Sequence, residues 1–286
     1  MATETNLEKV KKLRELTGAG FKDCSNAINE NKGNIEKSIE YLRIKGISKA
    51  SKKLERVAND GLICIKENNN QISIIEINCE TDFVAKNKEF VNFSEELSSI
   101  CFKEKGNLDK IKKTKMANSK SVEESLISLI SKIGEKITIR RSNFFDNVNG
   151  INFSYVHSSI KANVGKLAVI VNLESENNSK VKEFGHKLAM HIAASNPLSI
   201  DVNSLDPKVL KKEKNLINEE LKNSGKDQKI IDKISIGRIE KFKQENTLIN
   251  QIWVMDPKKK VKDVISEISG AKQIVVKDFI RYKLGE

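Results

Sequence analysis

Apolar residues recur at intervals of three or four positions through the first part of the chain. They form three stripes, each typical of one buried helix face: Leu7, Val10, Leu13 and Leu16, then Phe21, Cys24, Ala27 and Ile28, then Ile35, Ile39 and Leu42. Glycine-containing breaks at 17–20 and 31–33 separate the stripes, and Gly46 is expected to end the third helix. We therefore predict a three-helix module over residues 1–45. The basic, polar segment 46–59 is predicted to be a linker, helical in part.

The period of the apolar pattern then changes from helical spacing to alternation. Apolar and polar residues alternate on both sides of 68–70, which predicts a β-hairpin with an asparagine-rich turn. A helical stripe follows the hairpin, at Phe90, Phe93, Leu97 and Ile100. An amphipathic helix over 121–134 and a strand over 135–145 come next. Together these elements predict a core subdomain over residues 60–145.

A similar order of elements recurs in the second half. Strands are predicted over 151–158 and 167–173, and a helix follows with its apolar stripe at Phe184, Leu188, Ala189 and Ile192. The near-equal spacing of these elements in the two halves indicates a weak internal duplication of a strand–strand–helix unit. A helix over 260–269 and a strand over 272–284 complete a second core subdomain over residues 146–286.

The segment 206–245 differs from the rest of this subdomain. Its two charged helices carry only a narrow apolar seam and are joined by a short Ser-Gly turn, which predicts a projecting antiparallel helical hairpin. The fold class is therefore expected to be α+β. It comprises an N-terminal three-helix module and a duplicated α/β core with antiparallel strands, into which the hairpin is inserted.

Charge and apolar content narrow the functional classes. The 286 residues include 51 Lys and Arg against 39 Asp and Glu, a net charge of +12, and such a balance can indicate an RNA partner. Most lysines, however, stand beside acidic residues, and aromatics are only 5%, which leaves little for base stacking. No run approaches the roughly 18 apolar residues of a membrane span, and the N-terminus has no apolar signal core. We expect a cytoplasmic protein that binds neither membranes nor DNA.

Motifs of catalysis and cofactor binding are missing from the sequence. Gly165-Lys166 lacks the glycine five positions earlier that a phosphate-binding loop needs. The four cysteines contain no C-x-x-C pair, and His186 and His191 would lie about 140° apart around a helix. We therefore expect no enzyme activity, no cofactor, no metal site and no direct binding of nucleotides.

Several separate motifs, in order along the chain, resemble those of the bacterial elongation factor Ts family. They are LRELTGAGFKDCSNAI, EINCETDFVAKNKEF, KIGEKITIRR, SYVH, AMHIAASNP and the closing FIRYKLGE. The resemblance runs from about Leu7 to Glu286. By this resemblance the first three helices are similar to a ubiquitin-associated module, and the hairpin over 206–245 to the family's protruding coiled coil.

The resemblance implies a function. Members of this family are guanine-nucleotide exchange factors that bind elongation factor Tu, a translational GTPase, in its GDP-bound and nucleotide-free states. They promote release of GDP so that GTP can load. The alternative reading of the residues, a basic RNA- or ribosome-binding adaptor, rests on the net charge and on the basic segment 45–56.

The resemblance also implies functional residues. A tetrapeptide would disturb the Mg²⁺ site of elongation factor Tu: Thr81, Asp82, Phe83 and Val84. Three further positions would reach the phosphate-loop side of its nucleotide domain: Ile133, Gly134 and His157. The N-terminal module would bind through Leu13, Arg14, Thr17, Gly18, Ala19, Gly20 and Phe21.

The sequence departs from the family pattern at a few places. Phe21 stands where Met is frequent, and Glu80 stands where Gln is common. The sequence ends with FIRYKLGE itself, whereas several members continue with a further C-terminal helix. This last departure bears on the carboxy-terminal contact with elongation factor Tu.

Overall fold

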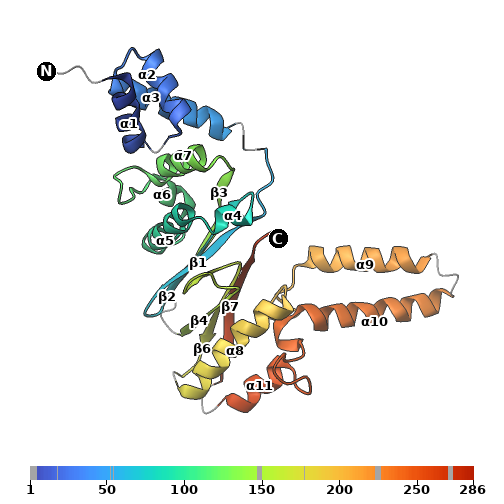
Figure 1. The fold of residues 1–286 in the computed structure, drawn as a ribbon. Coiled ribbons are helices and arrows are strands. Elements are labelled where there is room, and N and C mark those ends of the chain that lie inside the picture. The colour runs from blue at the N-terminus through green and yellow to red at the C-terminus, as the bar shows by residue number, and fades with distance from the viewer. Residues whose placement is uncertain are drawn as a thin grey trace.

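The computed structural model describes residues 5–17, 19–51, 53, 55–146, 150–176, 178–222, 227–269 and 273–286, with the backbone alone over 47–51. It combines helices with antiparallel sheets, so the predicted α+β class is confirmed (Figure 1). Within these ranges no helix is both long and apolar enough to cross a bilayer.

Three helices form the N-terminal module: α1 (Asn6–Thr17), α2 (Phe21–Glu30) and α3 (Ile35–Ser51). Their apolar stripes meet in a small core of Val10, Leu13, Cys24, Ala27 and Ile28. The expectation that Gly46 ends the third helix is wrong, because α3 continues to Ser51. Gly46 is buried against another helix, and a Cβ there would lie 3.6 Å from Ser131 Oγ. Close packing therefore outweighs the weak helix propensity of glycine.

The first sheet has the strand order β3-β2-β1-β5. Its strands are β1 (Asp60–Asn68), β2 (Gln71–Cys79), β3 (Ile137–Asp146) and β5 (Val164–Gly165). The predicted hairpin is confirmed, since Asn68 pairs with Gln71 across a two-residue turn. The helices of this half are α4 (Asp82–Ala85), α5 (Lys88–Lys103), α6 (Leu108–Lys113) and α7 (Val122–Ile133).

The second sheet has the order β4-β6-β7. Its strands are β4 (Ile151–His157), β6 (Leu167–Glu174) and β7 (Val275–Lys283), and its helices are α8 (Ser179–Ser195) and α11 (Val261–Ile268). In both halves a hairpin is followed by helices, and a last strand then pairs with the second strand of the hairpin. The predicted strand–strand–helix order is therefore present in each half.

A layer of apolar side chains lies between the two sheets. Ile63, Ile65, Ile72 and Ile74 of the first sheet meet Ala168, Ile170 and Tyr282 of the second. The alternate residues of β1, such as Leu62 and Cys64, face the helices instead. Because β1 is covered on both faces, its apolar residues are nearly continuous.

Two long helices extend away from the second sheet, α9 (Pro207–Lys222) and α10 (Gln228–Asn246), as Figure 1 shows. They pack against each other. Ile217 and Leu221 are buried in their narrow seam, and Ser235 Oγ donates a hydrogen bond to Asn218 Oδ1 at 3.0 Å. The short 3₁₀ helix η1 (Leu248–Asn250) returns the chain to the core.

Candidate partner-binding site

The side chain of Phe83 is 81% exposed. It belongs to the four-residue helix α4, which follows β2, while the next residues, Val84 and Ala85, are buried in the core of the first half. The helix therefore anchors itself by two small apolar side chains and presents a phenyl ring to solvent. A large apolar ring held outside the core in this way is available for contact with a partner.

Thr81 caps α4 and also fixes it to a distant turn. Its Oγ1 accepts a hydrogen bond from Val84 N at 3.4 Å and donates one to Glu135 Oε1 at 2.7 Å. Glu135 Oε2 accepts from the backbone N–H groups of Glu80 and Thr81, at 3.2 and 3.1 Å. The start of α4 is thus tied to the turn between α7 and β3.

The turn also donates a hydrogen bond back to the segment before α4. Glu80 Oε1 accepts from the backbone N–H of Lys136 at 2.6 Å. Arg56, on the chain that leads from α3 into β1, has its Nη1 3.4 Å from both carboxylate oxygens of Glu80, and its carbonyl accepts from Lys136 Nζ at 2.7 Å. Sequence reasoning named neither Glu135 nor Arg56, because their partners lie far away along the chain.

Asp82 stands beside Phe83 as an exposed carboxylate. Lys86 Nζ donates to Asp82 Oδ2 at 2.9 Å, and this hydrogen bond is the main reason why the pKa of Asp82 lies below its ordinary value. The charge of Lys166 lowers that pKa further. Asp82 is consequently an ionised, acceptor-only group at neutral pH, next to the exposed ring.

Ile133 and Gly134 lie on the same turn as Glu135. Ile133 packs partly buried against the core. Gly134 ends α7 with φ +88°, a left-handed conformation that favours glycine, and its N–H donates to Ile130 O at 2.9 Å. Because Glu135 binds the α4 segment, the predicted residues of this turn lie close to those of the tetrapeptide.

His157 is exposed at the end of β4, with Nδ1 2.9 Å from Tyr155 Oη. Its carbonyl accepts from Lys166 N at 3.3 Å, and Lys166 Nζ forms an ion pair with Asp60 at 3.0 Å. Asp60 pairs with Cys79 at the end of the hairpin from which α4 departs. His157 is thus linked through Lys166 to the end of the first sheet, close to the start of α4.

Only some of the residues predicted to bind a partner in the N-terminal module are exposed. Arg14, Gly20 and Phe21 are exposed, Phe21 to 49%. Leu13 is fully buried in the module core, since it lies on the stripe that packs against α2, so its side chain stabilises the module and is not available for contact. Gly18 lies outside the described residues.

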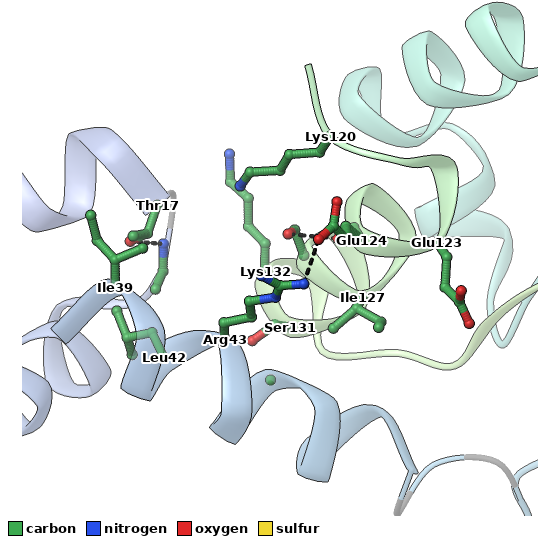
Figure 2. A pocket seen from close by; sticks show the side chains of 13 residues that line it. Thr17, Ile39, Leu42, Arg43, Lys120, Glu123, Glu124, Ile127, Ser131 and Lys132 are labelled. Atoms are coloured by element: carbon green, nitrogen blue, oxygen red, sulfur yellow. Dashed lines mark hydrogen bonds and ion pairs between the residues drawn. The ribbon is translucent and has the colours of Figure 1, made fainter. Parts of the chain in front are cut away.

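Thr17 and Ala19 have intermediate exposure and shape the turn between α1 and α2. Thr17 Oγ1 donates to Leu13 O at 2.6 Å and accepts from Ala19 N at 3.3 Å. Both residues also line an open cavity of about 540 Å³ between the module and α7. Figure 2 shows Ile39 and Leu42 of α3 on one side of it and Ile127 on the other, with Arg43 bound to Glu124.

Metal ligands are not gathered at this site. Within the part of the chain that the structure describes, no cluster of three His, Cys, Asp or Glu side chains could hold a metal ion. The site combines an apolar ring, a carboxylate and hydrogen-bonding groups.

Comparisons with known proteins identify the family. A family model described as Elongation factor TS matches residues 80–286. Elongation factor Ts of Rickettsia prowazekii (strain Madrid E) is 42% identical over 281 residues, covering 97% of this chain and 91% of the relative. The chain belongs to the elongation factor Ts family. It is therefore a translation elongation factor, which takes part in protein biosynthesis.

Other family members show similar agreement. Elongation factor Ts of Gluconobacter oxydans (strain 621H) is 38% identical over 278 residues, covering 97% of this chain and 91% of the relative. That of Parvibaculum lavamentivorans is 39% identical over 287 residues, covering 99% and 93%. The family match over 80–286 includes the tetrapeptide, the turn after α7 and His157.

Proposed function

We propose that this elongation factor Ts family member is a guanine-nucleotide exchange factor for elongation factor Tu. It binds the GDP-bound protein, disturbs the Mg²⁺ and phosphate site, and promotes GDP release so that GTP can load. The observation that carries the proposal is the exposed Phe83 on an otherwise anchored helix. The factor itself needs no cofactor and binds no nucleotide.

Phe83 and Asp82 have different roles toward elongation factor Tu. The phenyl ring is a rigid apolar wedge that can enter between two elements of elongation factor Tu, and burial of such a ring is a frequent source of interface energy. The neighbouring carboxylate brings a negative charge toward a site that binds Mg²⁺ and phosphate. Thr81 and Val84 support this pair, one by capping α4 and the other by anchoring it.

Further contacts would broaden the interface. The turn at Ile133 and Gly134 and the strand end at His157 face the phosphate-loop side of the partner in this proposal. The module resembles a ubiquitin-associated domain and adds the surface around Arg14, Gly20 and Phe21, which are exposed. The α9–α10 hairpin corresponds to the family's coiled coil.

Thermodynamic linkage sets what these contacts must achieve. If the factor weakens GDP binding in the complex, GDP weakens binding of the factor by the same ratio. Each tenfold change requires about 1.4 kcal/mol of differential interaction. A differential interaction of that size can come from a few groups such as Phe83 and Asp82.

The test is release of a fluorescent GDP from purified elongation factor Tu, with this protein at substoichiometric amounts. Acceleration with turnover supports the proposal. No acceleration by a folded sample, with elongation factor Tu from the same source, contradicts it. Salt-dependent binding to RNA would in that case favour the adaptor alternative, since phosphate contacts make affinity fall steeply with salt.

A further inference from the structure

Beside Phe83, two chain segments each donate hydrogen bonds to a carboxylate of the other. Glu135 accepts three hydrogen bonds from the segment before α4: from Glu80 N at 3.2 Å, Thr81 N at 3.1 Å and Thr81 Oγ1 at 2.7 Å. Glu80 in return accepts from Lys136 N at 2.6 Å. We call this arrangement of Glu80, Thr81, Glu135 and Lys136 the carboxylate clasp.

Hydrogen bonds to an ionised acceptor are stronger than neutral ones. Three of them converge on one partly buried carboxylate in the clasp. Arg56 adds a third segment, since its guanidinium lies 3.4 Å from Glu80 and its carbonyl accepts from Lys136 Nζ. The clasp is thus the point where the chain from α3, the start of α4 and the turn after α7 are joined.

Strand pairing alone would hold the two main segments near each other. Cys79, the last residue of β2, pairs with Ile137, the first residue of β3. That pairing ends before α4, however, and a four-residue helix has almost no stability of its own. The direction of α4 therefore depends on its cap together with the burial of Val84 and Ala85, and the capping residue Thr81 is the one that Glu135 holds.

Phe83 itself supplies no restraint, because most of its ring contacts solvent. Its position is set by the backbone of α4, which the clasp holds at its start and the buried Val84 and Ala85 hold at its end. We propose that Glu135 is a positioning residue for nucleotide exchange. Its carboxylate holds Phe83 at a fixed place beside the Ile133–Gly134 turn, so that both meet elongation factor Tu as one rigid surface. This inference rests on the proposed exchange function.

The first experiment compares Glu135→Ala and Glu135→Gln with wild type in GDP release over a range of factor concentrations. A positioning role lowers the maximal release rate more than it raises the half-saturating concentration. We expect about a tenfold lower maximal rate for Glu135→Ala, since a displacement of about 1 Å can cost on the order of a hundredfold. Glu135→Gln retains an acceptor oxygen and should restore part of the rate.

A double-mutant cycle separates positioning from general support of the fold. If Glu135 acts through Phe83, Glu135→Ala has little further effect in a Phe83→Ala background. Additive losses in the double variant would overturn the inference. Thermal unfolding of each variant is measured alongside. If Glu135→Ala fails to fold, Thr81→Val removes only the hydroxyl bonds and is expected to lower the maximal rate in the same direction; a wild-type rate for it overturns the inference.

Glu96→Gln is the matched control. Glu96 Oε1 also accepts a backbone hydrogen bond across two segments, from Ala117 N at 2.6 Å, but it has no link to α4. Its rate should equal that of wild type, and a loss equal to that of Glu135→Gln would contradict the assignment. If the wild type does not accelerate GDP release from elongation factor Tu, both the proposed function and this inference are contradicted. An active wild type with a fully active Glu135→Ala removes the inference alone.

Discussion

The guanidinium carbon of Arg141 lies 4.2 Å from the centre of the Tyr282 ring. Arg141 belongs to β3 of the first sheet and Tyr282 to β7 of the second, so the contact joins the two sheets. Arg141 Nε also donates to Glu76 Oε2 at 2.5 Å, and Arg140 Nη1 donates to Glu76 Oε1 at 2.9 Å. A β-bulge beside Glu76 lets two successive arginines reach the same carboxylate.

The buried carboxylate of Glu76 is expected to matter for stability. Glu76→Ala should lower the free energy of unfolding by about 1.5–3 kcal/mol, because it removes a buried carboxylate that accepts hydrogen bonds from two partly exposed guanidinium groups. Unfolding in denaturant measures this. Glu240→Ala, which breaks an exposed pair with Lys243, should change it by less than about 0.5 kcal/mol. Equal effects of the two substitutions would contradict the structural role of Glu76.

Phe83 and Phe90 are expected to behave in opposite ways. Phe83→Ala removes an exposed ring, so unfolding should change by no more than about 0.5 kcal/mol while GDP release from elongation factor Tu slows markedly. Phe90→Ala empties a fully buried site and should cost about 3–5 kcal/mol. Calorimetry and the release assay are run on both variants. A destabilised Phe83→Ala protein would show that its ring packs against the fold.

Two helical glycines provide a further pair of variants. A Cβ at Gly185 in α8 would lie 2.2 Å from the Phe153 ring, whereas a Cβ at Gly237 in α10 has nothing within 4 Å. Gly185→Ala should therefore destabilise the protein, since ring and helix must separate. Gly237→Ala should stabilise it by up to about 1 kcal/mol through helix propensity. The midpoints of thermal unfolding should move in opposite directions, and a shared direction would argue against this packing.

His191 is expected to make stability depend on pH. It is fully buried, its Nδ1 accepts from Val254 N at 3.3 Å, and its Nε2 therefore donates to Gln251 Oε1 at 3.0 Å. Burial lowers its pKa below the ordinary 6.5. The unfolded chain thus binds a proton more readily than the folded one. The contribution of neutral His191 is fully present above pH 6.5 and is lost as the pH falls from 6.5 through the lowered folded value.

The measurement is the free energy of unfolding at several pH values between neutral and mildly acidic. His191→Asn should be less stable than wild type near neutral pH, and the difference should shrink as the pH falls. His186→Gln changes an exposed histidine of the same helix and serves as the control. A difference between wild type and His191→Asn that is independent of pH would refute a titrating role for His191.

Periodicity predicted the helices and strands because those patterns report on a single buried face. It was wrong at Gly46, where contacts with Ser131 from a distant helix decide the outcome. It could not find the bulge at Arg140, because a bulge is a relation between two strands. Nor could it show that Phe83 points outward while Val84 points inward, since both are apolar and adjacent.

The candidate site shows the same limit. Resemblance to the family supplied Asp82 and Phe83, but residues that hold them in place had no signal in the local sequence. Glu135 binds a segment 54 and 55 positions away, so only the folded chain brings the two together. Leu13 stands within a motif that resembles the family. Its side chain nevertheless packs in the core of the N-terminal module, as its place on the apolar stripe of α1 indicates.

The α9–α10 hairpin enters and leaves the second sheet's half at neighbouring points. Leu198 N donates to Asn246 O at 2.8 Å, and Leu248 N donates to Ser199 O at 2.9 Å. The two ends of the hairpin are therefore hydrogen-bonded to each other where it leaves the second half of the core. Residues can therefore be added to or removed from the far end of the hairpin without a change in the register of β6 and β7.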